Sequence, residues 1–184
     1  MAKRRNRELA GPAIVLAGAG VVTGAVAVGV FARRRRRGIG APMERSKLIV
    51  KRLFEEPWQG SFEAIDEFVS TGYIGHDPAE PEPIRGPAGV RANAEKYIAA
   101  FPGGAITVDE QIVEGDRVAT RWTGRGTHTG ELAGVAPTGK DVTVSGLTIS
   151  RFHSGKVVEE WTTWDTLGLL VQLGAVGAAQ SEVR

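Results

Sequence analysis

The sequence contains no cysteine among its 184 residues. Disulfide bonds, thiolate nucleophiles and zinc sites with cysteine ligands are therefore excluded. Histidine is scarce as well, and His76, His128 and His153 are too widely separated to show the short ligand spacing of a metal site. We therefore expect no bound metal. A nucleophile elbow, a phosphate-binding loop and a dinucleotide fingerprint are also missing, so nothing in the sequence indicates nucleotide binding.

Positive charge is concentrated near the N-terminus. Residues 1–45 hold ten of the 23 lysines and arginines and only two acidic residues. Residues 46–184 carry 13 basic and 19 acidic residues, so this part is acidic although the whole chain has a net charge of +2. A nucleic-acid-binding domain needs a basic face. Nucleic acid is therefore not expected as a partner.

A long uncharged segment over residues 9–32 follows the basic start of the chain. About 20 mostly apolar residues suffice for a helix to cross a bilayer, so we expect a single transmembrane helix here. A cleaved secretory signal is the alternative, but the arginines from Arg33 to Arg37 oppose translocation and favour an uncleaved anchor. We expect these arginines to contact anionic lipid headgroups and to keep the following domain on the cytoplasmic face.

The chain is expected to consist of a basic tail (1–8), the transmembrane helix (9–32), an Arg-rich linker (33–43), a folded domain (44–174) and a flexible tail (175–184). Helical spacing of apolar residues predicts helices over residues 44–54, 62–69 and 87–101, with a Pro-rich loop at 76–83. Alternating apolar residues then predict strands at 106–108, 111–113, 117–126, 142–153 and 156–164, before a last helix at 167–173. Helices followed by antiparallel strands indicate an α+β domain with helices on one face of a curved sheet.

Several short segments of the folded domain occur in an order typical of a known family. They read HDP at 76–78, GTHTGE at 126–131, PTGK at 137–140, GKVVEEW at 155–161 and WDTLGLL at 164–170. Together they resemble the SnoaL-like polyketide and ester cyclase group of the nuclear transport factor 2-like superfamily. The resemblance covers about residues 44–174.

The resemblance implies a cone-shaped, strongly bent antiparallel sheet that three helices wrap around an apolar cavity. It implies a cofactor-independent cyclase or isomerase that acts on a small hydrophobic carbonyl compound, with an aspartate as acid/base and without a metal. Such domains often pair into dimers, so a homodimer is expected. The same superfamily includes binding domains, and fold alone does not determine function. A non-catalytic, membrane-tethered ligand-binding or assembly domain is therefore the alternative.

Two residues are the candidates for catalysis. Asp165 matches the family's acid/base aspartate, and Trp161 and Trp164 could desolvate its carboxylate and make it a stronger base. The alternative for Asp165 is an N-cap of the last helix. His76 lies where the family's cavity is bordered, and as a donor it could polarise a substrate carbonyl. The alternative for His76 is a His-Asp-Pro turn in which Asp77 bonds its own backbone.

The expected ligand-binding residues are four aromatic side chains and one serine of the predicted cavity wall: Tyr97, Phe101, Trp122, Ser145 and Trp161. The family also places a polar group on its fourth strand, and three positions match that description here: Ser145, Arg151 and His153. The flanking glycines of His128 and the turn after His153 predict that both histidines are exposed.

Overall fold

The structure of the protein is a computed structural model that describes residues 42–176. Its elements are a helix over residues 42–55, η1 (Pro57–Gln59), α2 (Glu63–Phe68), β1 (Val69–His76), β2 (Ile84–Arg85), α3 (Gly86–Ala100), β3 (Ala105–Glu114), β4 (Arg117–Thr127), β5 (Asp141–His153), β6 (Lys156–Trp164) and α4 (Thr166–Leu173). Helices come first, long strands follow, and a short helix closes the domain. This order confirms the predicted α+β class.

The strands form one sheet in the order β2-β1-β6-β5-β4-β3. Strands β3 to β6 pair antiparallel as predicted, but β1 pairs parallel with β6. The sheet is therefore mixed, and the prediction of an antiparallel sheet was wrong for this pair. Hairpin connections make neighbouring strands antiparallel, whereas β1 reaches its partner through a connection that includes most of the domain.

Strand β1 begins where the sequence analysis expected a helix to end. The predicted helix over 62–69 stops at Phe68, and Val69 is already the first residue of the strand. Val69 and Tyr73 are both buried on the inner side of β1. Because β-branched and aromatic side chains fit the half-buried surface of a sheet, these residues gain more burial in a strand than in a continued helix.

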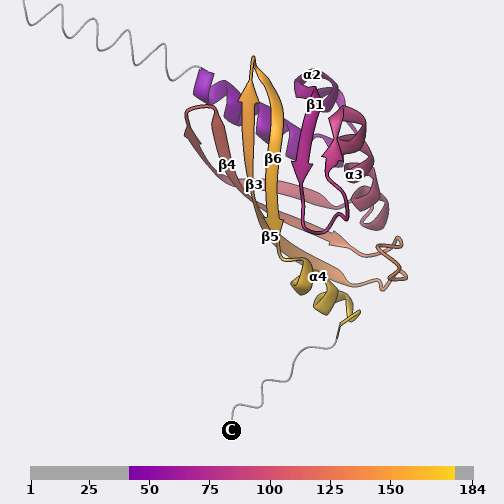
Figure 1. Cartoon of the computed structure of the whole chain (residues 1–184). Helices are drawn as coiled ribbons and strands as arrows, with labels where there is room; N and C mark the ends of the chain where they lie inside the picture. Colours follow the sequence, from indigo (N-terminus) through magenta and orange to yellow (C-terminus); the bar gives the residue numbers. More distant parts are fainter. Residues whose placement is uncertain (1–41, 177–184) are drawn as a thin grey trace, which may run out of the picture. The chain divides into compact units, whose positions relative to one another are not determined.

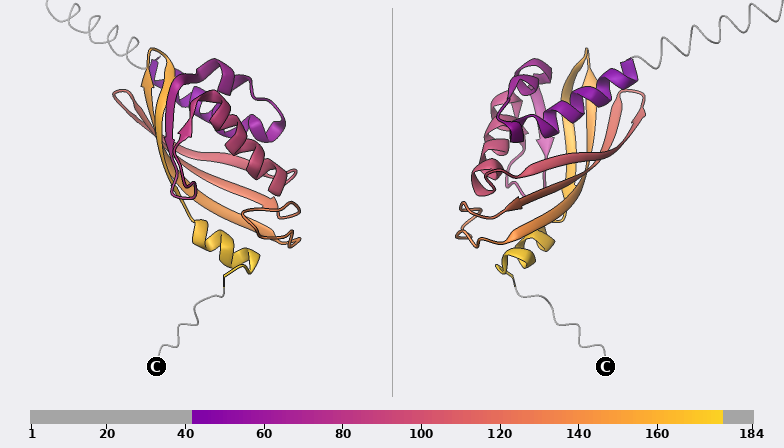
Figure 2. Two further views of the ribbon diagram at one scale, coloured as in Figure 1. Left: turned by 45° about the vertical axis from the view of Figure 1, so that its right-hand side comes forward. Right: turned by 180° about the vertical axis from the view of Figure 1, so that it is seen from behind.

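Figures 1 and 2 show helix 42–55, α2 and α3 on one face of a bent sheet, with α4 beyond the end of β6. The ladder between β3 and β4 changes register between Val108 and Glu110, and the ladder between β5 and β6 changes register between Arg151 and Phe152. Such irregularities bend strands and increase their twist. The sheet therefore curves around the helices, in agreement with the predicted layering of three helices on one face.

Buried apolar side chains form two separate clusters. The first joins helix 42–55, α2 and the start of β6, and it includes Ile65 and Val157. The second joins the end of α3 to β5 and α4, and it includes Phe101 and Leu169. Because the two clusters lie near opposite ends of β6, the inner face of the sheet between them is not filled by one continuous core.

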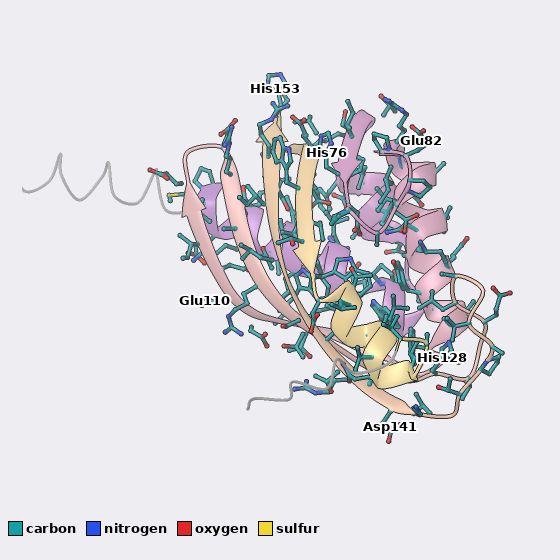
Figure 3. All side chains as sticks on the ribbon, turned by 60° about the horizontal axis from the view of Figure 1, so that its bottom comes forward. His76, Glu82, Glu110, His128, Asp141 and His153 are labelled. Carbon is teal, nitrogen blue, oxygen red and sulfur yellow. The ribbon has the colours of Figure 1, made fainter. Side chains whose placement is uncertain are left out.

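The loop between β4 and β5 buries His128, so the prediction of an exposed His128 was wrong. Its side chain is 0% exposed, and its ring lies 5.3 Å from that of Phe101. The backbone N–H of Thr138 donates to Nδ1 at 3.3 Å, because the loop folds back over the histidine. His153, in contrast, is exposed at the tip of the β5–β6 hairpin as predicted (Figure 3).

Several expectations concern residues or assemblies outside the part of the chain that the structure describes. The expected transmembrane helix over 9–32 and the arginines from Arg33 to Arg37 precede residue 42. Within residues 42–176, no helix combines the length and the hydropathy needed to span a membrane. The homodimer expected from the resemblance stays a prediction.

Gly146 of β5 provides a test of the close contact between this strand and the indole ring of Trp122, which belongs to β4. A Cβ atom at position 146 would overlap the indole ring of Trp122, so Gly146→Ala must displace that ring. We expect the substitution to lower the free energy of unfolding by about 1–3 kcal/mol, measured by urea denaturation.

Gly72→Ala is the matched control, because Gly72 of β1 is exposed and a Cβ there would meet only Ser70 Oγ, at 3.9 Å. Its free energy of unfolding should stay close to that of the wild type. Equal denaturation midpoints for the two variants would contradict the position of the Trp122 ring.

Candidate functional site

A cavity of about 210 Å³ lies between the two apolar clusters. Its wall takes residues from both clusters, from helix 42–55 and α3, and from the inner faces of the strands. Most of these residues are apolar, and many are aromatic, among them Trp58, Tyr73, Tyr97, Phe101, Trp122 and Trp164. A concave, mainly apolar site with a few polar groups is typical of a pocket for a small organic ligand.

The structure separates the residues that the sequence analysis assigned to ligand binding. Tyr97, Phe101 and Trp122 line the cavity. Trp161 and Ser145 do not, because side chains alternate along a strand and these two residues lie on the outer face of the sheet. The backbone carbonyl of Ser145 instead accepts a hydrogen bond from the N–H of Asp165, at 3.2 Å.

Asp165 is the N-cap residue of α4. Its Oδ1 accepts a hydrogen bond from the backbone N–H of Gly168 at 2.8 Å, and a Cβ at position 168 would overlap the carboxylate. Asp165 is exposed and does not line the cavity. The structure therefore places it in the capping position named as the alternative and does not bring it together with His76. Its acid/base role stays a prediction.

His76, at the end of β1, lines the cavity and also a second hollow beside the Pro-rich loop. Its ring stacks on the indole of Trp161, with 5.7 Å between the centroids and 12° between the planes. Its Nε2 lies 3.1 Å from Oε1 of Glu159, which is itself paired with Arg151 at 2.6 Å. The imidazole is therefore held at the border of the cavity by contacts on the outer face of the sheet.

Asp77 follows directly and combines a turn with a contact to the cavity wall. Its Oδ1 accepts a hydrogen bond from the backbone N–H of Ala79 at 2.9 Å, which confirms the predicted turn. The same oxygen accepts from the indole Nε1 of Trp164 at 3.1 Å. Asp77 therefore fixes the orientation of an aromatic ring that lines the cavity.

Glu160 of β6 brings a carboxyl group into the cavity wall. The phenol of Tyr73 donates to Oε2 at 2.8 Å, and the hydroxyl of Ser150 donates to Oε1 at 2.5 Å. Burial raises the pKa of Glu160 above its usual range, although the two hydroxyl donors oppose the shift. The carboxyl group is thus held in one orientation by two neutral donors in an apolar surrounding.

Tyr73 is positioned for this contact by a glycine two residues later. The side chain of Tyr73 is buried, and a Cβ at Gly75 would lie 2.6 Å from its Oη, so the phenol needs the glycine to lie along β1. Burial, and next the charge of Glu160, raise the pKa of the Tyr73 phenol well above its usual value. Tyr73 therefore stays a neutral hydrogen-bond donor over the physiological range.

Further polar groups cross the inner face of the sheet. The indole of Trp122 donates to Thr148 Oγ1 at 3.2 Å, and this oxygen lies 2.9 Å from Thr162 Oγ1. On the helix side, Asn93 lines the cavity, and its Oδ1 is buried without a hydrogen-bond partner among the described residues. Within residues 42–176, no three His, Asp or Glu side chains are grouped so as to hold a metal ion.

Sequence reasoning missed Glu160, although a signal was present. Glu160, Thr162 and Trp164 alternate along β6, and all three line the cavity. An acidic residue on the inner face of a strand is costly unless it is paired or functional, so this position was the one to single out. The motif-based assignment of Asp165 drew attention to the end of the strand instead.

The bent sheet, its helical layer and the apolar cavity between them are those of a nuclear transport factor 2-like domain. The family model that matches the chain is that of the SnoaL-like polyketide cyclases, and the match covers residues 48–173. The protein belongs to this family, as the sequence resemblance predicted. A search of curated proteins finds no match.

Solved structures support the same assignment. IdmH from Streptomyces antibioticus, described as a polyketide cyclase, is 33% identical, with a TM-score of 0.60 over 71% of this chain and 98% of its own. A SnoaL-like polyketide cyclase from Jannaschia Sp. CCS1 is 25% identical, with a TM-score of 0.66 over 73% and 94%. AclR from Streptomyces galilaeus, described as a hydroxylase, is 30% identical, with a TM-score of 0.63 over 75% and 85%.

The raised pKa of Glu160 predicts how stability depends on pH. In the unfolded chain the carboxyl loses its proton near its ordinary pKa of 4.5, whereas the folded protein keeps the proton to higher pH. Between these two values the folded state binds more protons than the unfolded state, so its stability falls as pH rises. We expect Glu160→Gln to remove this contribution, measured as the free energy of unfolding in urea from pH 4.5 to 8.

Glu110→Gln is the control, because Glu110 is an exposed carboxylate on β3 (Figure 3). Its stability profile should run parallel to that of the wild type. If Glu160→Gln and the wild type have the same slope over this range, the shifted ionisation of Glu160 is refuted.

Proposed function

We propose that the protein is a cofactor-independent cyclase or isomerase that acts on a small hydrophobic carbonyl compound by acid/base catalysis. The observation that carries this proposal is the cavity itself, an apolar and aromatic space with the carboxyl group of Glu160 in its wall. Membership in the SnoaL-like polyketide cyclase family supports the same class of reaction.

An apolar cavity with a carboxyl group suits the chemistry of such a reaction. Ring closure by aldol condensation and shifts of a double bond both begin with removal of a proton next to a carbonyl. A carboxylate that is shielded from water is a stronger base, and a general base is most efficient when its pKa lies near the working pH. Aromatic walls add contact area for a planar ligand without charges that would compete with the base.

The cavity volume limits the size of the ligand. An apolar cavity of about 150 Å³ can hold one benzene ring, and the cavity here measures about 210 Å³. A ligand of one or two rings therefore fits within this volume, whereas a larger polycyclic ligand would extend beyond it.

A second function remains the alternative, namely a non-catalytic domain that binds a ligand or assembles with other proteins. The position of Asp165 favours it, because a carboxylate that caps a helix in contact with water does not reach a ligand in the cavity. His76 points in the same direction, since its ring is engaged by Trp161 and Glu159.

Turnover distinguishes the two functions. We expect the full-length protein to convert a compound in a small-molecule extract of the cells that produce it, detected by chromatography with mass detection. Retention times are read together with masses, because an isomerisation leaves the mass unchanged. Ala94→Phe, which adds a ring to the cavity wall from α3, should lose both ligand retention and conversion.

Retention of the same ligands by the wild type without conversion would favour the binding function over the enzymatic one. Asp165→Asn belongs in the same assay. Asparagine preserves the N-cap, since Asn and Asp are equivalent caps, so a loss of conversion at unchanged stability would assign the acid/base role to Asp165.

We also propose that residues 9–32 anchor the protein in a membrane, with the folded domain on the cytoplasmic face. The length of the uncharged segment and the arginines from Arg33 to Arg37 support this proposal. A tether of this kind places the cavity close to the bilayer, where a hydrophobic substrate is concentrated.

The anchor is tested by fractionation and protease protection. The full chain should stay with membranes in alkaline carbonate, and protease added to intact cells should leave the folded domain uncut. Val22→Lys combined with Val26→Lys should release the chain, because each lysine at the centre of a membrane helix costs about 2.5–3.5 kcal/mol. Rapid cleavage from outside the cell would overturn the cytoplasmic orientation.

A further inference from the structure

We propose that Glu160 is the residue that removes and returns the proton of the substrate, with Tyr73 as the hydrogen-bond donor to the enolate oxygen, and that the substrate is an enolisable ketone of one or two rings. This inference rests on the proposed function. It assigns the proton transfer to residues of the cavity wall rather than to Asp165, the exposed N-cap residue of α4.

The two oxygens of Glu160 are engaged in a way that leaves the group basic. Oε2 accepts one hydrogen bond from Tyr73 and Oε1 accepts one from Ser150, so each oxygen keeps a lone pair for another contact. No cationic side chain is a hydrogen-bond partner of Glu160 among the described residues. Glu160 lines the cavity and Ser150 does not, so the hydroxyl of Ser150 supports the carboxylate from behind.

The preceding residue provides an internal comparison. Glu159 faces the outer side of the same strand, where hydrogen bonds from Arg151 and His76 hold its pKa below the usual range. Glu160 faces the cavity, where burial raises its pKa. The outer carboxylate is therefore neutralised by cationic and imidazole partners, whereas the carboxyl group in the cavity wall has only two neutral hydroxyl donors.

Tyr73 is the second part of the pair. Its phenol lies 2.8 Å from the carboxylate and lines the same cavity, and it stays neutral. A neutral hydroxyl next to the base can donate to the oxygen on which negative charge develops. The other ionisable groups in the described cavity wall are His76, Asp77, Tyr97 and Arg125.

Glu160 and Tyr73 suffice for the proton transfer, and no other reactant is needed. The carboxylate of Glu160 takes the hydrogen next to the ketone as a proton, the C–H electron pair forms the carbon–carbon double bond, and the negative charge moves to the carbonyl oxygen. Protonated Glu160 accepts hydrogen bonds less strongly, so the O–H of Tyr73 turns to the enolate oxygen. Where the enolate is conjugated with a carbon–carbon double bond, Glu160 returns the proton to the far carbon of this dienolate, the double bond moves next to the carbonyl, and the isomerisation is complete. In a cyclisation the enolate carbon attacks a second carbonyl, and the proton goes to the new alkoxide.

A simple probe tests this pair before the substrate is known. 2-Tetralone is an enolisable two-ring ketone, and exchange of its α-hydrogens in D2O is followed by NMR with the full-length protein. We expect exchange above the buffer rate for the wild type, a loss of at least about a hundredfold for Glu160→Gln and of about a hundredfold for Tyr73→Phe. Glu110→Gln is the matched control and should exchange at the wild-type rate.

Two further measurements separate a chemical role from a structural one. Binding of 2-naphthol, the planar phenol that resembles the enol of 2-tetralone, is followed by fluorescence and should persist in Glu160→Gln and Tyr73→Phe. Ser150→Ala keeps the carboxyl group but removes one donor, so the midpoint of its pH–rate profile should lie above that of the wild type. An unchanged midpoint would contradict the supporting role of Ser150 and with it the proposed environment of the base.

Two results of the exchange assay would overturn the inference. One is exchange that persists in Glu160→Gln, and its loss in Asp165→Asn would then assign the role to Asp165. The other is a wild type that binds 2-naphthol without exchanging 2-tetralone. Conversion of a natural compound that survives Glu160→Gln would also overturn it and would leave the proposed function intact. Absence of any conversion by the wild type contradicts the proposed function instead.

Discussion

The parallel pairing of β1 with β6 is the constraint on which the site depends. It sets Gly75 opposite Glu160 and His76 opposite Trp161, although the two strands are far apart in the sequence. On the inner side, Gly75 leaves room for the phenol of Tyr73 to reach Glu160. On the outer side, the same register stacks His76 on Trp161. A shift of this register by one residue would turn each side chain to the other face and separate both contacts.

Much of the fold could be predicted from local patterns, because β4, β5 and β6 alternate clearly and turns separate them. Strand β1 could not. No turn residue separates Phe68 from Val69, and apolar spacing alone does not distinguish the end of a helix from the start of a strand. Its parallel partner lies far along the chain, so no local signal indicates the pairing. The prediction that His128 is exposed was wrong for a similar reason. The loop that buries His128 is closed by a contact with Thr138, ten residues further along the chain, and no local pattern indicates this contact.

The site could be predicted only in part. Tyr97, Phe101 and Trp122 were chosen as large side chains of helical or alternating segments, and these segments do face the cavity. Trp161 was chosen by the same reasoning but lies on the outer face. The register shift between Arg151 and Phe152 changes which residues of the hairpin point inward, and a sequence does not reveal such a shift. The alternation along β6 groups Glu160 with Thr162 and Trp164, and the pairing of Glu160 with Ser150 in the ladder shows that this group faces inward.

Glu160 of β6 and Asp165, which directly follows the end of this strand, are two carboxylates in contrasting surroundings. Asp165 stands in the most recognisable motif of the domain, yet the N–H of Gly168 and the surrounding water already stabilise its charge. The charge of Glu160 has no such stabilisation beyond two neutral hydroxyls, and the apolar wall around it opposes ionisation. A base works by gaining a proton, so a carboxylate gains most from protonation where its charge is least stabilised. In this cavity the least stabilised carboxylate is that of Glu160. Burial of an ionisable group lowers the stability of the fold, and this cost is the physical reason to connect Glu160 with function.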